Sequence, residues 1–249
     1  MSLRSISVVI PLHNERDNIE TLVSELEQQL QRSFVSCGRP CEIILVNDGS
    51  TDGTRETLDR RTLKQSSVAI RAVHLYPRQG QSVALGTGFR ASTGDIICTL
   101  DGDLQNDPKD LPQFAALLDQ GAEFVTGWRK ERKGDKFKKI CPSTLANILI
   151  RFLTGTSLHD LGCGIKAYKR KVALDLNLSP GMHRFINPWM ERRGFKVAEV
   201  QVIDRARVSG QSKYGFARIF QVLLGLVLFY IRLCRASKVK RLPVNNSTS

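Results

Sequence analysis

Short apolar runs alternate with amphipathic segments along the first half of the chain. The runs at 7–11, 42–46, 68–75, 95–100 and 123–126 are each four to eight residues long, which predicts buried strands. The segments between them carry apolar residues at helical spacing, as in Ile19, Leu22, Val23, Leu26 and Leu30. Strands that alternate with helices predict an α/β fold, with a doubly wound, mostly parallel sheet and helices on both faces.

Helix boundaries follow from the polar residues between the runs. Ser50 or Thr51 is expected to cap a helix that ends near Lys64. Further helices are predicted over 80–91 and 110–120. The 249-residue chain is long enough for one such domain, which we place at residues 1–216.

The second half has a different pattern. Helices are expected over 136–153 and 172–178, a strand or turn over 160–168, and a strand over 195–203. Residues 219–231 are apolar except for Gln221, and they are too few to cross a bilayer, which takes about 20 residues. Basic residues lie on both sides of this run, so segment 217–249 is predicted to lie on an anionic membrane surface; the alternative is a helix packed on the sheet or in a dimer interface.

Charge is concentrated in two patches. The net charge is +13, yet residues 128–139 hold seven Lys/Arg against two acids, and residues 205–249 hold nine and no acid. A near-neutral body with two basic patches indicates anionic partners such as a nucleotide or a phospholipid surface. The six cysteines form no Cys-x-x-Cys spacing, which favours reduced thiols over a disulfide framework or a zinc site. The first strand has no apolar leader before it, so no signal peptide is expected.

Two carboxylates follow the fourth apolar run. Asp101 and Asp103 come directly after Leu100, at the edge where open α/β sheets bind ligands. Carboxylate oxygens are the ligands that hard divalent cations prefer.

Four motifs together resemble a known family. They are the segments 8–15, 46–52, 101–108 and 210–214, which stand in order at the expected separations. The chain resembles the inverting family 2 glycosyltransferases with the GT-A fold, and within them the polyprenyl-phosphate branch that contains dolichol-phosphate mannosyltransferases and their bacterial undecaprenyl-phosphate relatives. The resemblance covers roughly residues 5–230.

The resemblance implies a donor site for a UDP- or GDP-linked sugar. Its nucleotide-binding residues would be Pro11, His13, Glu15, Asp48, Gly80 and Asp101. It further implies Mg²⁺ or Mn²⁺, held by Asp103 with Gln105 and Asp101 and bridged to the diphosphate, whose leaving charge the metal neutralises. His13 stands where many relatives carry tyrosine.

The implied acceptor is a polyprenyl phosphate. Its oxygen is already ionised, so the attack needs no general base, and positive charge must instead bring two anions together. Arginine suits this because it binds phosphate through two hydrogen bonds. The expected acceptor ligands are Arg129, Arg132, Arg205, Arg207, Ser212 and Lys213, and all of them except Arg132 and Ser212 join Asp101 and Asp103 as catalytic candidates.

Three other positions bear on the acceptor cleft. Asp204 stands where relatives often carry histidine, and we expect it to pair with Arg205 or Arg207. Asp160 and the segment His183–Phe185 match family elements near the cleft, and a structural role for Asp160 is equally compatible with the sequence.

The sequence therefore predicts an enzyme on the cytoplasmic face of a membrane. One rival is a related transferase that acts on a sugar hydroxyl, with Asp160 as the candidate base. The other is a non-catalytic protein that binds nucleic acid or membrane, and the scarcity of aromatic residues in the basic segments argues against nucleic acid. The donor sugar and the oligomeric state, including a homo-oligomer, stay open.

Overall fold

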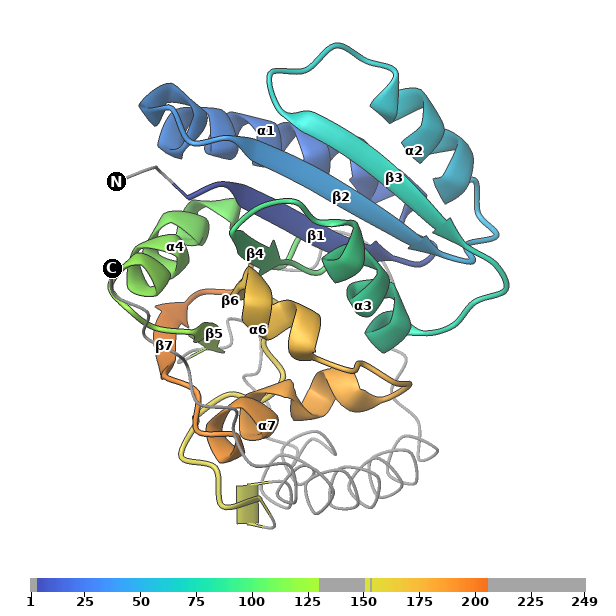
Figure 1. The fold of residues 1–249 in the computed structure, drawn as a ribbon. Coiled ribbons are helices and arrows are strands. Elements are labelled where there is room, and N and C mark those ends of the chain that lie inside the picture. The colour runs from blue at the N-terminus through green and yellow to red at the C-terminus, as the bar shows by residue number, and fades with distance from the viewer. Residues whose placement is uncertain (1–3, 130–150, 153, 206–249) are drawn as a thin grey trace, which may run out of the picture.

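A seven-stranded sheet forms the centre of the protein. The computed structural model describes residues 4–129, 151–152 and 154–205 (Figure 1). The strand order is β3-β2-β1-β4-β6-β5-β7. The strands are β1 (Ile6–Leu12), β2 (Cys41–Asp48), β3 (Ala69–Leu75), β4 (Ile96–Thr99), β5 (Phe124–Arg129), β6 (Lys166–Lys169) and β7 (Val197–Val202).

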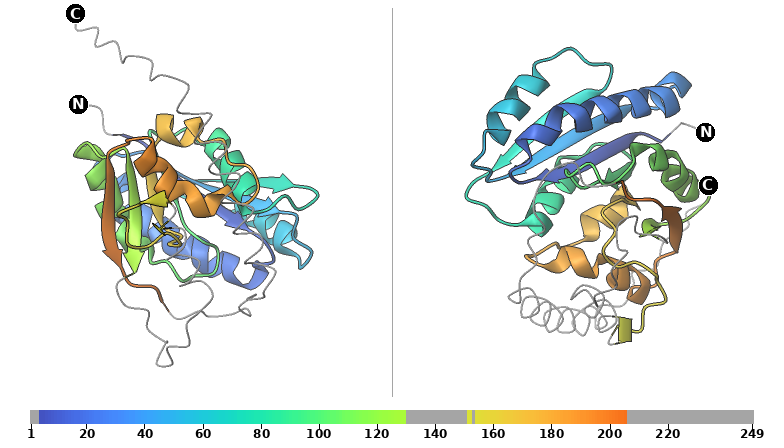
Figure 2. Two further views of the ribbon diagram at one scale, coloured as in Figure 1. Left: turned by 90° about the horizontal axis from the view of Figure 1, so that it is seen from below. Right: turned by 180° about the vertical axis from the view of Figure 1, so that it is seen from behind.

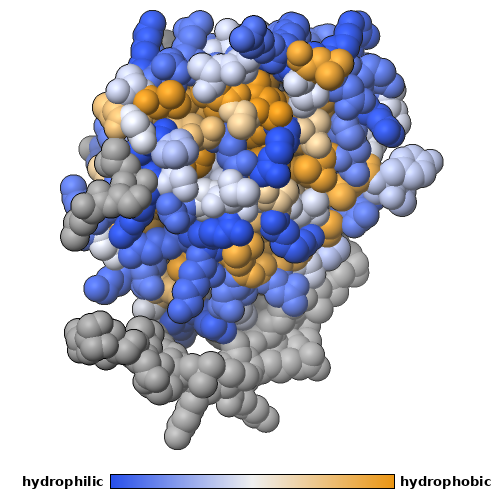
Figure 3. Space-filling model, turned by 45° about the horizontal axis from the view of Figure 1, so that its top comes forward, coloured by the Kyte–Doolittle hydropathy of each residue, from blue (hydrophilic) through white to orange (hydrophobic). Residues whose placement is uncertain are grey.

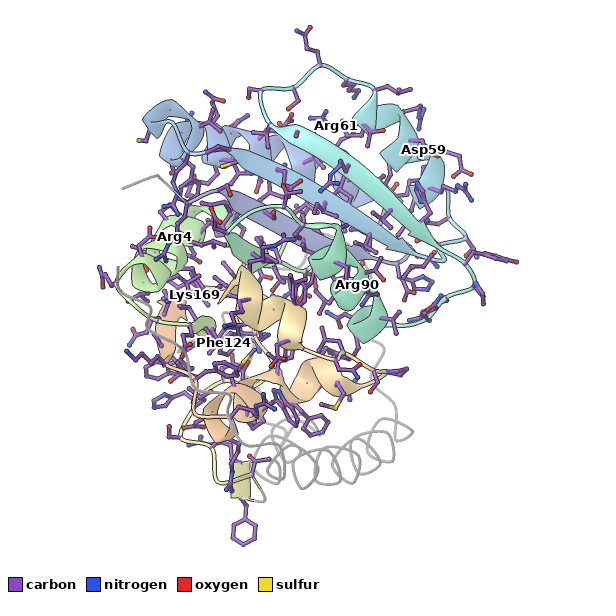
Figure 4. All side chains as sticks on the ribbon, viewed as in Figure 1. Arg4, Asp59, Arg61, Arg90, Phe124 and Lys169 are labelled. Atoms are coloured by element: carbon purple, nitrogen blue, oxygen red, sulfur yellow. The ribbon has the colours of Figure 1, made fainter. Side chains whose placement is uncertain are left out.

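Helices cover both faces of the sheet (Figures 1 and 2). One apolar core lies under α1 (Ile19–Ser33), α2 (Thr54–Thr62) and α4 (Leu111–Asp119). The other lies under α3 (Gln81–Ala91), α6 (Arg170–Asp175) and α7 (Ile186–Arg192), and Phe124, labelled on β5 in Figure 4, belongs to it. Short 3-10 turns are η1 (Arg16–Asn18), η2 (Val35–Cys37), η3 (Pro108–Asp110) and η4 (Met182–Phe185).

The alternation of apolar and amphipathic segments explains these layers. In β1, Val8 and Ile10 enter the α1 core while Val9 enters the α3 core, because successive strand residues point to opposite faces. The apolar positions of the first predicted helix are all buried along α1. The predicted α/β fold with a mostly parallel sheet is confirmed.

The cap of α2 differs from the prediction. The helix begins at Thr54 after Gly53, and neither Ser50 nor Thr51 caps it. The Ser50 hydroxyl instead accepts from the backbone N–H of Asn14 at 2.9 Å, and the N–H of Thr51 donates to the Asn14 side chain at 2.8 Å. These two polar residues therefore join the loops that follow β1 and β2.

Strand β6 is antiparallel to both of its neighbours, an orientation that the sequence pattern left open. It pairs Lys166 with Thr99 of β4 and with Thr126 of β5. Because β6 runs the other way, the loop that leads into it meets the C-terminal ends of β4 and β5. Residues 160–165 are thus brought to the edge of the sheet where ligands bind, and there Asp160 binds Arg129 of β5 and Gly164 O accepts from Thr99 of β4.

The predicted helix over 136–153 lies mostly outside the described residues, and the apolar run 219–231 lies outside them entirely. In the part that the structure describes, no helix has both the length and the apolar character needed to cross a bilayer. Both hydrophilic and hydrophobic side chains reach the surface shown in Figure 3. The large apolar side chains exposed among the described residues are those of Leu63, Tyr76, Phe152, Leu174 and Ile203.

Candidate functional site

The loops after β1 and β2 meet at one edge of the sheet. The His13 imidazole Nδ1 lies 2.9 Å from the backbone oxygen of Asp48. The Glu15 backbone N–H donates to the Thr54 hydroxyl at 3.1 Å, and the Glu15 carboxylate accepts from Asn18 at 2.6 Å. The residues predicted to bind the nucleoside are therefore neighbours, although they come from two separate motifs.

Asp48 connects β2 to the start of α3. Its carboxylate is buried and accepts the backbone N–H of Gln79 at 2.7 Å and that of Gly80 at 2.8 Å. Gly80 has a φ of +92°, a conformation that glycine adopts without strain. The carboxylate thus fixes the segment that opens α3, and the first residues of this helix reach two further parts of the site.

These first residues of α3 contact Asp101 and His183. The Gln81 amide donates to the Asp101 carboxylate at 3.0 Å. The Ser82 hydroxyl lies 2.8 Å from Nδ1 of His183 and accepts the backbone N–H of the same residue at 3.0 Å. The segment His183–Phe185 is therefore joined to α3, close to the loop that carries the two acids.

The loop after β4 holds Asp101 and Asp103 in a tight turn. The backbone N–H of Asp101 donates to Asn106 Oδ1 at 3.1 Å, and the N–H of Gln105 donates to Asp103 Oδ1 at 3.2 Å. Leu104, between Asp103 and Gln105, is buried with a φ of +63°, which is rare for a branched side chain. Its burial compensates for the strain and holds the turn.

Asp101 packs against Gly164 at the approach to β6. A Cβ at Gly164 would lie 2.1 Å from Asp101 Oδ2 and 2.6 Å from Asn106 Oδ1, so only glycine leaves room for the acid. Burial and then the neighbouring Asp103 carboxylate raise the pKa of Asp101, while Lys166 and Arg129 act in the opposite sense. This environment favours a partner with positive charge.

Arg129, at the end of β5, is bound by two carboxylates. Its Nε and Nη2 donate to the two oxygens of Asp160 at 2.6 and 3.0 Å, and its Nη1 donates to Asp204 at 3.1 Å. Burial alone would raise the pKa of Asp160, but the hydrogen bonds and charge of Arg129 outweigh it and hold this pKa low. Asp160 is thus a buried ion-pair partner.

Arg205 also has carboxylate partners, which come from two other parts of the chain. Its guanidinium lies 2.5 Å from Glu25 and 2.8 Å from Asp107, and its backbone N–H donates to Gln105 O at 2.8 Å. Asp204 pairs with Arg129 and not with Arg205, and the alternative partner, Arg207, lies outside the described residues. The chain leaving β7 is therefore fastened to the loop that carries the acids.

Four residues that shape this site were not predicted from the sequence. Asn106 and Asp107 stand inside the acidic motif, so their position was a usable signal. Lys166 is buried on β6, donates to the Cys163 backbone oxygen, and its pKa is lowered by burial. Asn187, on the unpredicted α7, donates to Asp160 O at 2.8 Å and carries no sequence signal.

The remaining predicted residues fall into two groups. Pro11 is the last but one residue of β1, next to the loop that carries His13 and Glu15. Arg132, Arg207, Ser212 and Lys213 lie outside the described residues. Within the described ranges, no group of three or more His, Cys, Asp or Glu side chains is arranged to hold a metal ion.

Comparison with known proteins identifies relatives of the chain. The family model for glycosyl transferase family 2 matches residues 7–176. Dodecaprenyl-phosphate galacturonate synthase of Rhizobium johnstonii is 38% identical over 91% of this chain and 67% of its own length. Undecaprenyl-phosphate 4-deoxy-4-formamido-L-arabinose transferase of Pectobacterium atrosepticum is 33% identical over 90% of this chain and 67% of its own length. The chain thus spans about two thirds of these relatives.

Solved structures share the fold at lower identity. Glucosyl-3-phosphoglycerate synthase of Mycobacterium tuberculosis, in complex with Mn²⁺, UDP and glucosyl-3-phosphoglycerate, is 20% identical with a TM-score of 0.62, covering 92% of this chain and 80% of that one. The mannosyltransferase PcManGT of Pyrobaculum calidifontis, in complex with GDP-Man and Mn²⁺, is 19% identical with a TM-score of 0.61. That match covers 98% of this chain and 67% of the mannosyltransferase chain. These two likenesses support the fold.

Proposed function

The chain belongs to glycosyl transferase family 2, and we propose that it transfers one sugar, with inversion, from a nucleotide-diphosphate sugar to a polyprenyl phosphate. The observation that carries the proposal is that the loops after β1 and β2 and the Asp101–Asp103 turn meet at one edge of the sheet. The named activities of the relatives, both on polyprenyl phosphates, supply the acceptor class.

The donor would lie across the ends of β1, β2 and β4. In this proposal Pro11, His13 and Glu15 line the nucleoside pocket, and Asp48 keeps the backbone at Gly80 close to it. The diphosphate would point toward Asp101 and Asp103. UDP and GDP donors both stay candidates, because no contact in the described residues distinguishes the two bases.

The acids fit a divalent cation. Arg129 binds Asp160 and Asp204, and Asp101 lies near Asp103, Lys166 and Arg129. These four acids and two bases leave a formal excess of two negative charges. Mg²⁺ is commonly held by one or two carboxylates plus substrate phosphates, so a full protein cage is not required. Asp103, with Gln105 and Asp101, would hold Mg²⁺ or Mn²⁺, which supplies Lewis-acid stabilisation of the departing diphosphate.

The acceptor phosphate would approach from the side of β7. Arg205 and Gln105 fasten the start of the basic segment beside the acidic turn, so the chain that carries Arg207, Ser212 and Lys213 leaves from the edge of the donor site. Strand β5 ends at this edge with Arg129, three positions before Arg132 in the sequence. Positive charge supplied here would lower the repulsion between the two phosphate groups.

The rival mechanism needs a general base, and Asp160 is poorly suited to that role. Both of its oxygens are engaged by Arg129, its Oδ1 also accepts the N–H of Gly162 at 2.9 Å, and Arg129 keeps its pKa low. An efficient base has a pKa near the working pH. The geometry therefore favours an acceptor that is already ionised.

The test of the proposed function is transfer of sugar to undecaprenyl phosphate by the full chain with Mn²⁺ or Mg²⁺. Asp103→Asn keeps an oxygen for the Gln105 N–H but removes the charge, and we expect a loss of about 10²-fold or more. Undiminished transfer by this variant would contradict the metal role. A wild-type chain that transfers only to sugar hydroxyls would contradict the acceptor.

We further propose that the protein binds the cytoplasmic face of a membrane peripherally. Support comes from the apolar run 219–231 and the basic residues beside it. Sedimentation with anionic phosphatidylglycerol vesicles, but not with neutral phosphatidylcholine vesicles, is the expected result. Equal recovery with both would contradict an electrostatic contribution.

A further inference from the structure

Arg129 is enclosed by acids of its own chain. The guanidinium and its two partners are largely buried, with side-chain exposures of 14% for Arg129, 8% for Asp160 and 15% for Asp204. Each of its three nitrogens lies within hydrogen-bond distance of a carboxylate oxygen. A phosphate would have to displace one of these acids from a buried ion pair, which is costly.

The contacts of Asp204 extend this ion pair to the acidic turn. Its Oδ2 accepts from Arg129, while its Oδ1 lies 3.4 Å from the Asn106 amide nitrogen. The other side of the Asn106 amide accepts the backbone N–H of Asp101 at 3.1 Å. A continuous chain of polar contacts therefore runs from Arg129 to the backbone of Asp101.

The opposite end of this chain is firmly held. The Asp160 backbone oxygen accepts from the Asn187 amide at 2.8 Å, and the same amide lies 3.1 Å from the Thr126 hydroxyl on β5. The Asp160 carboxylate also accepts the N–H of Gly162 at 2.9 Å. Asp160 is thus fixed to its own loop and to α7, whose Asn187 is itself bound to β5, so Asp160 can serve as an anchor.

We propose that Arg129 is a positioning residue of the donor site. It ties Asp204 to the anchored Asp160 and so, through Asn106, fixes the turn that presents Asp101 and Asp103 to the metal and diphosphate. This differs from the sequence-based expectation, in which Arg129 binds the acceptor phosphate. The inference rests on the proposed function only in taking the acidic turn as the donor site.

The two roles predict opposite kinetic effects. A positioning role lowers the affinity for the metal and nucleotide and leaves the KM for the acceptor nearly unchanged. A role as acceptor ligand raises that KM and leaves nucleotide binding intact. The effect on metal affinity can be measured by binding alone, without turnover, and the KM for the acceptor is measured separately.

The experiment is a titration of Mn²⁺ into the full chain with saturating UDP, repeated with GDP, and followed by the electron paramagnetic resonance of free Mn²⁺. We expect Arg129→Gln to weaken Mn²⁺ binding at least fivefold, with the KM for undecaprenyl phosphate within twofold of wild type. Asp204→Asn should weaken Mn²⁺ binding similarly. The double variant should be little worse than either single variant, because both act through one contact. Arg90→Gln is the matched control, since Arg90 is exposed on α3 and donates only to Thr87 on the same helix among its described hydrogen bonds (Figure 4).

Mn²⁺ affinity within twofold of wild type, together with a raised acceptor KM, would overturn the inference. If Arg129→Gln does not fold, Asn106→Ala decides, because it removes the link and leaves the buried ion pair in place. It should show the same loss of Mn²⁺ affinity, and wild-type affinity would overturn the inference. Failure of the proposed function gives a different result, in which wild-type protein transfers no sugar to polyprenyl phosphate while the difference in Mn²⁺ affinity persists.

Discussion

Replacement of Gly164 by alanine tests the packing of Asp101 directly. The new Cβ would lie 2.1 Å from Asp101 Oδ2 and 2.5 Å from its Cγ, whereas ordinary contacts begin near 3.4 Å. The carboxylate would therefore have to move by about 1.3 Å, the difference between 3.4 and 2.1 Å. Such a movement disturbs the hydrogen bond from the Gln81 amide, which lies 3.0 Å from Oδ1.

The expected consequence is a large loss of transfer with a smaller loss of stability. A misplacement of roughly 1 Å in a catalytic constellation can cost about 10²-fold in rate. Overpacking of this kind costs roughly 1–3 kcal/mol in the free energy of unfolding. We therefore expect Gly164→Ala to fold and to retain about 1% of wild-type kcat/KM.

The assay compares radiolabelled sugar transfer and urea unfolding of Gly164→Ala with those of Gly162→Ala. Gly162 lies in the same loop, but a Cβ there would meet its nearest atoms, on Arg129 and Asp160, at 3.4 and 3.8 Å. This control should keep activity within a few-fold of wild type. Wild-type activity in Gly164→Ala would refute the argument that the acid needs this space.

Three further changes test other parts of the structure. Gly88→Ala places a Cβ 2.2 Å from Val9 Cγ1 in the core under α3, and urea unfolding should show a loss of roughly 1–3 kcal/mol; an unchanged midpoint would contradict the close approach of α3 to β1. Burial and then the Asp107 carboxylate raise the pKa of Asp110 to about 6. Between about pH 4 and pH 6 the folded protein therefore binds more protons than the unfolded chain, and it loses stability as the pH rises through this range. Asp110→Asn should remove that loss and raise the melting temperature at pH 7 but not at pH 4, and an equal effect at both values would contradict the assignment. The lowered pKa of Asp160 gives the opposite pH dependence of stability. Its contribution to the free energy of unfolding is present above pH 4 and is lost on acidification through the folded-state pKa. Asp160→Asn should lower the free energy of unfolding by about 3 kcal/mol at pH 7, and this loss should be smaller in strong acid. Thermal unfolding of the variant and of wild type at pH 7 and in strong acid measures the difference.

The fold was largely predictable because its determinants are local. Apolar strands and the spacing of the α1 residues appear directly in the sequence, and each is a property of a short segment. The start of α2 was not predictable in this way. Ser50 and Thr51 are good capping residues, but a contact with Asn14, 36 and 37 positions away, takes them.

The site was predictable in its motifs but not in its pairings. Asp101 and Asp103 were found because they follow an apolar run, and Asp48 was found through the motif that resembles the family. The partners of Arg129 and Arg205 were not found, since Asp204 lies 75 positions from the first and Glu25 lies 180 from the second. A basic residue in a motif looks free to bind phosphate until the fold shows which acids face it.

The proposed reaction forms a bond between one sugar and a lipid monophosphate. The most direct measurement is mass spectrometry of the lipid formed when the full chain meets undecaprenyl phosphate, Mn²⁺ and a panel of UDP- and GDP-sugars. We expect a lipid that has gained one sugar and keeps a single phosphate, with release of the matching nucleoside diphosphate. A product that carries sugar on a hydroxyl of an added lipid-linked saccharide, with undecaprenyl phosphate left unchanged, would contradict it.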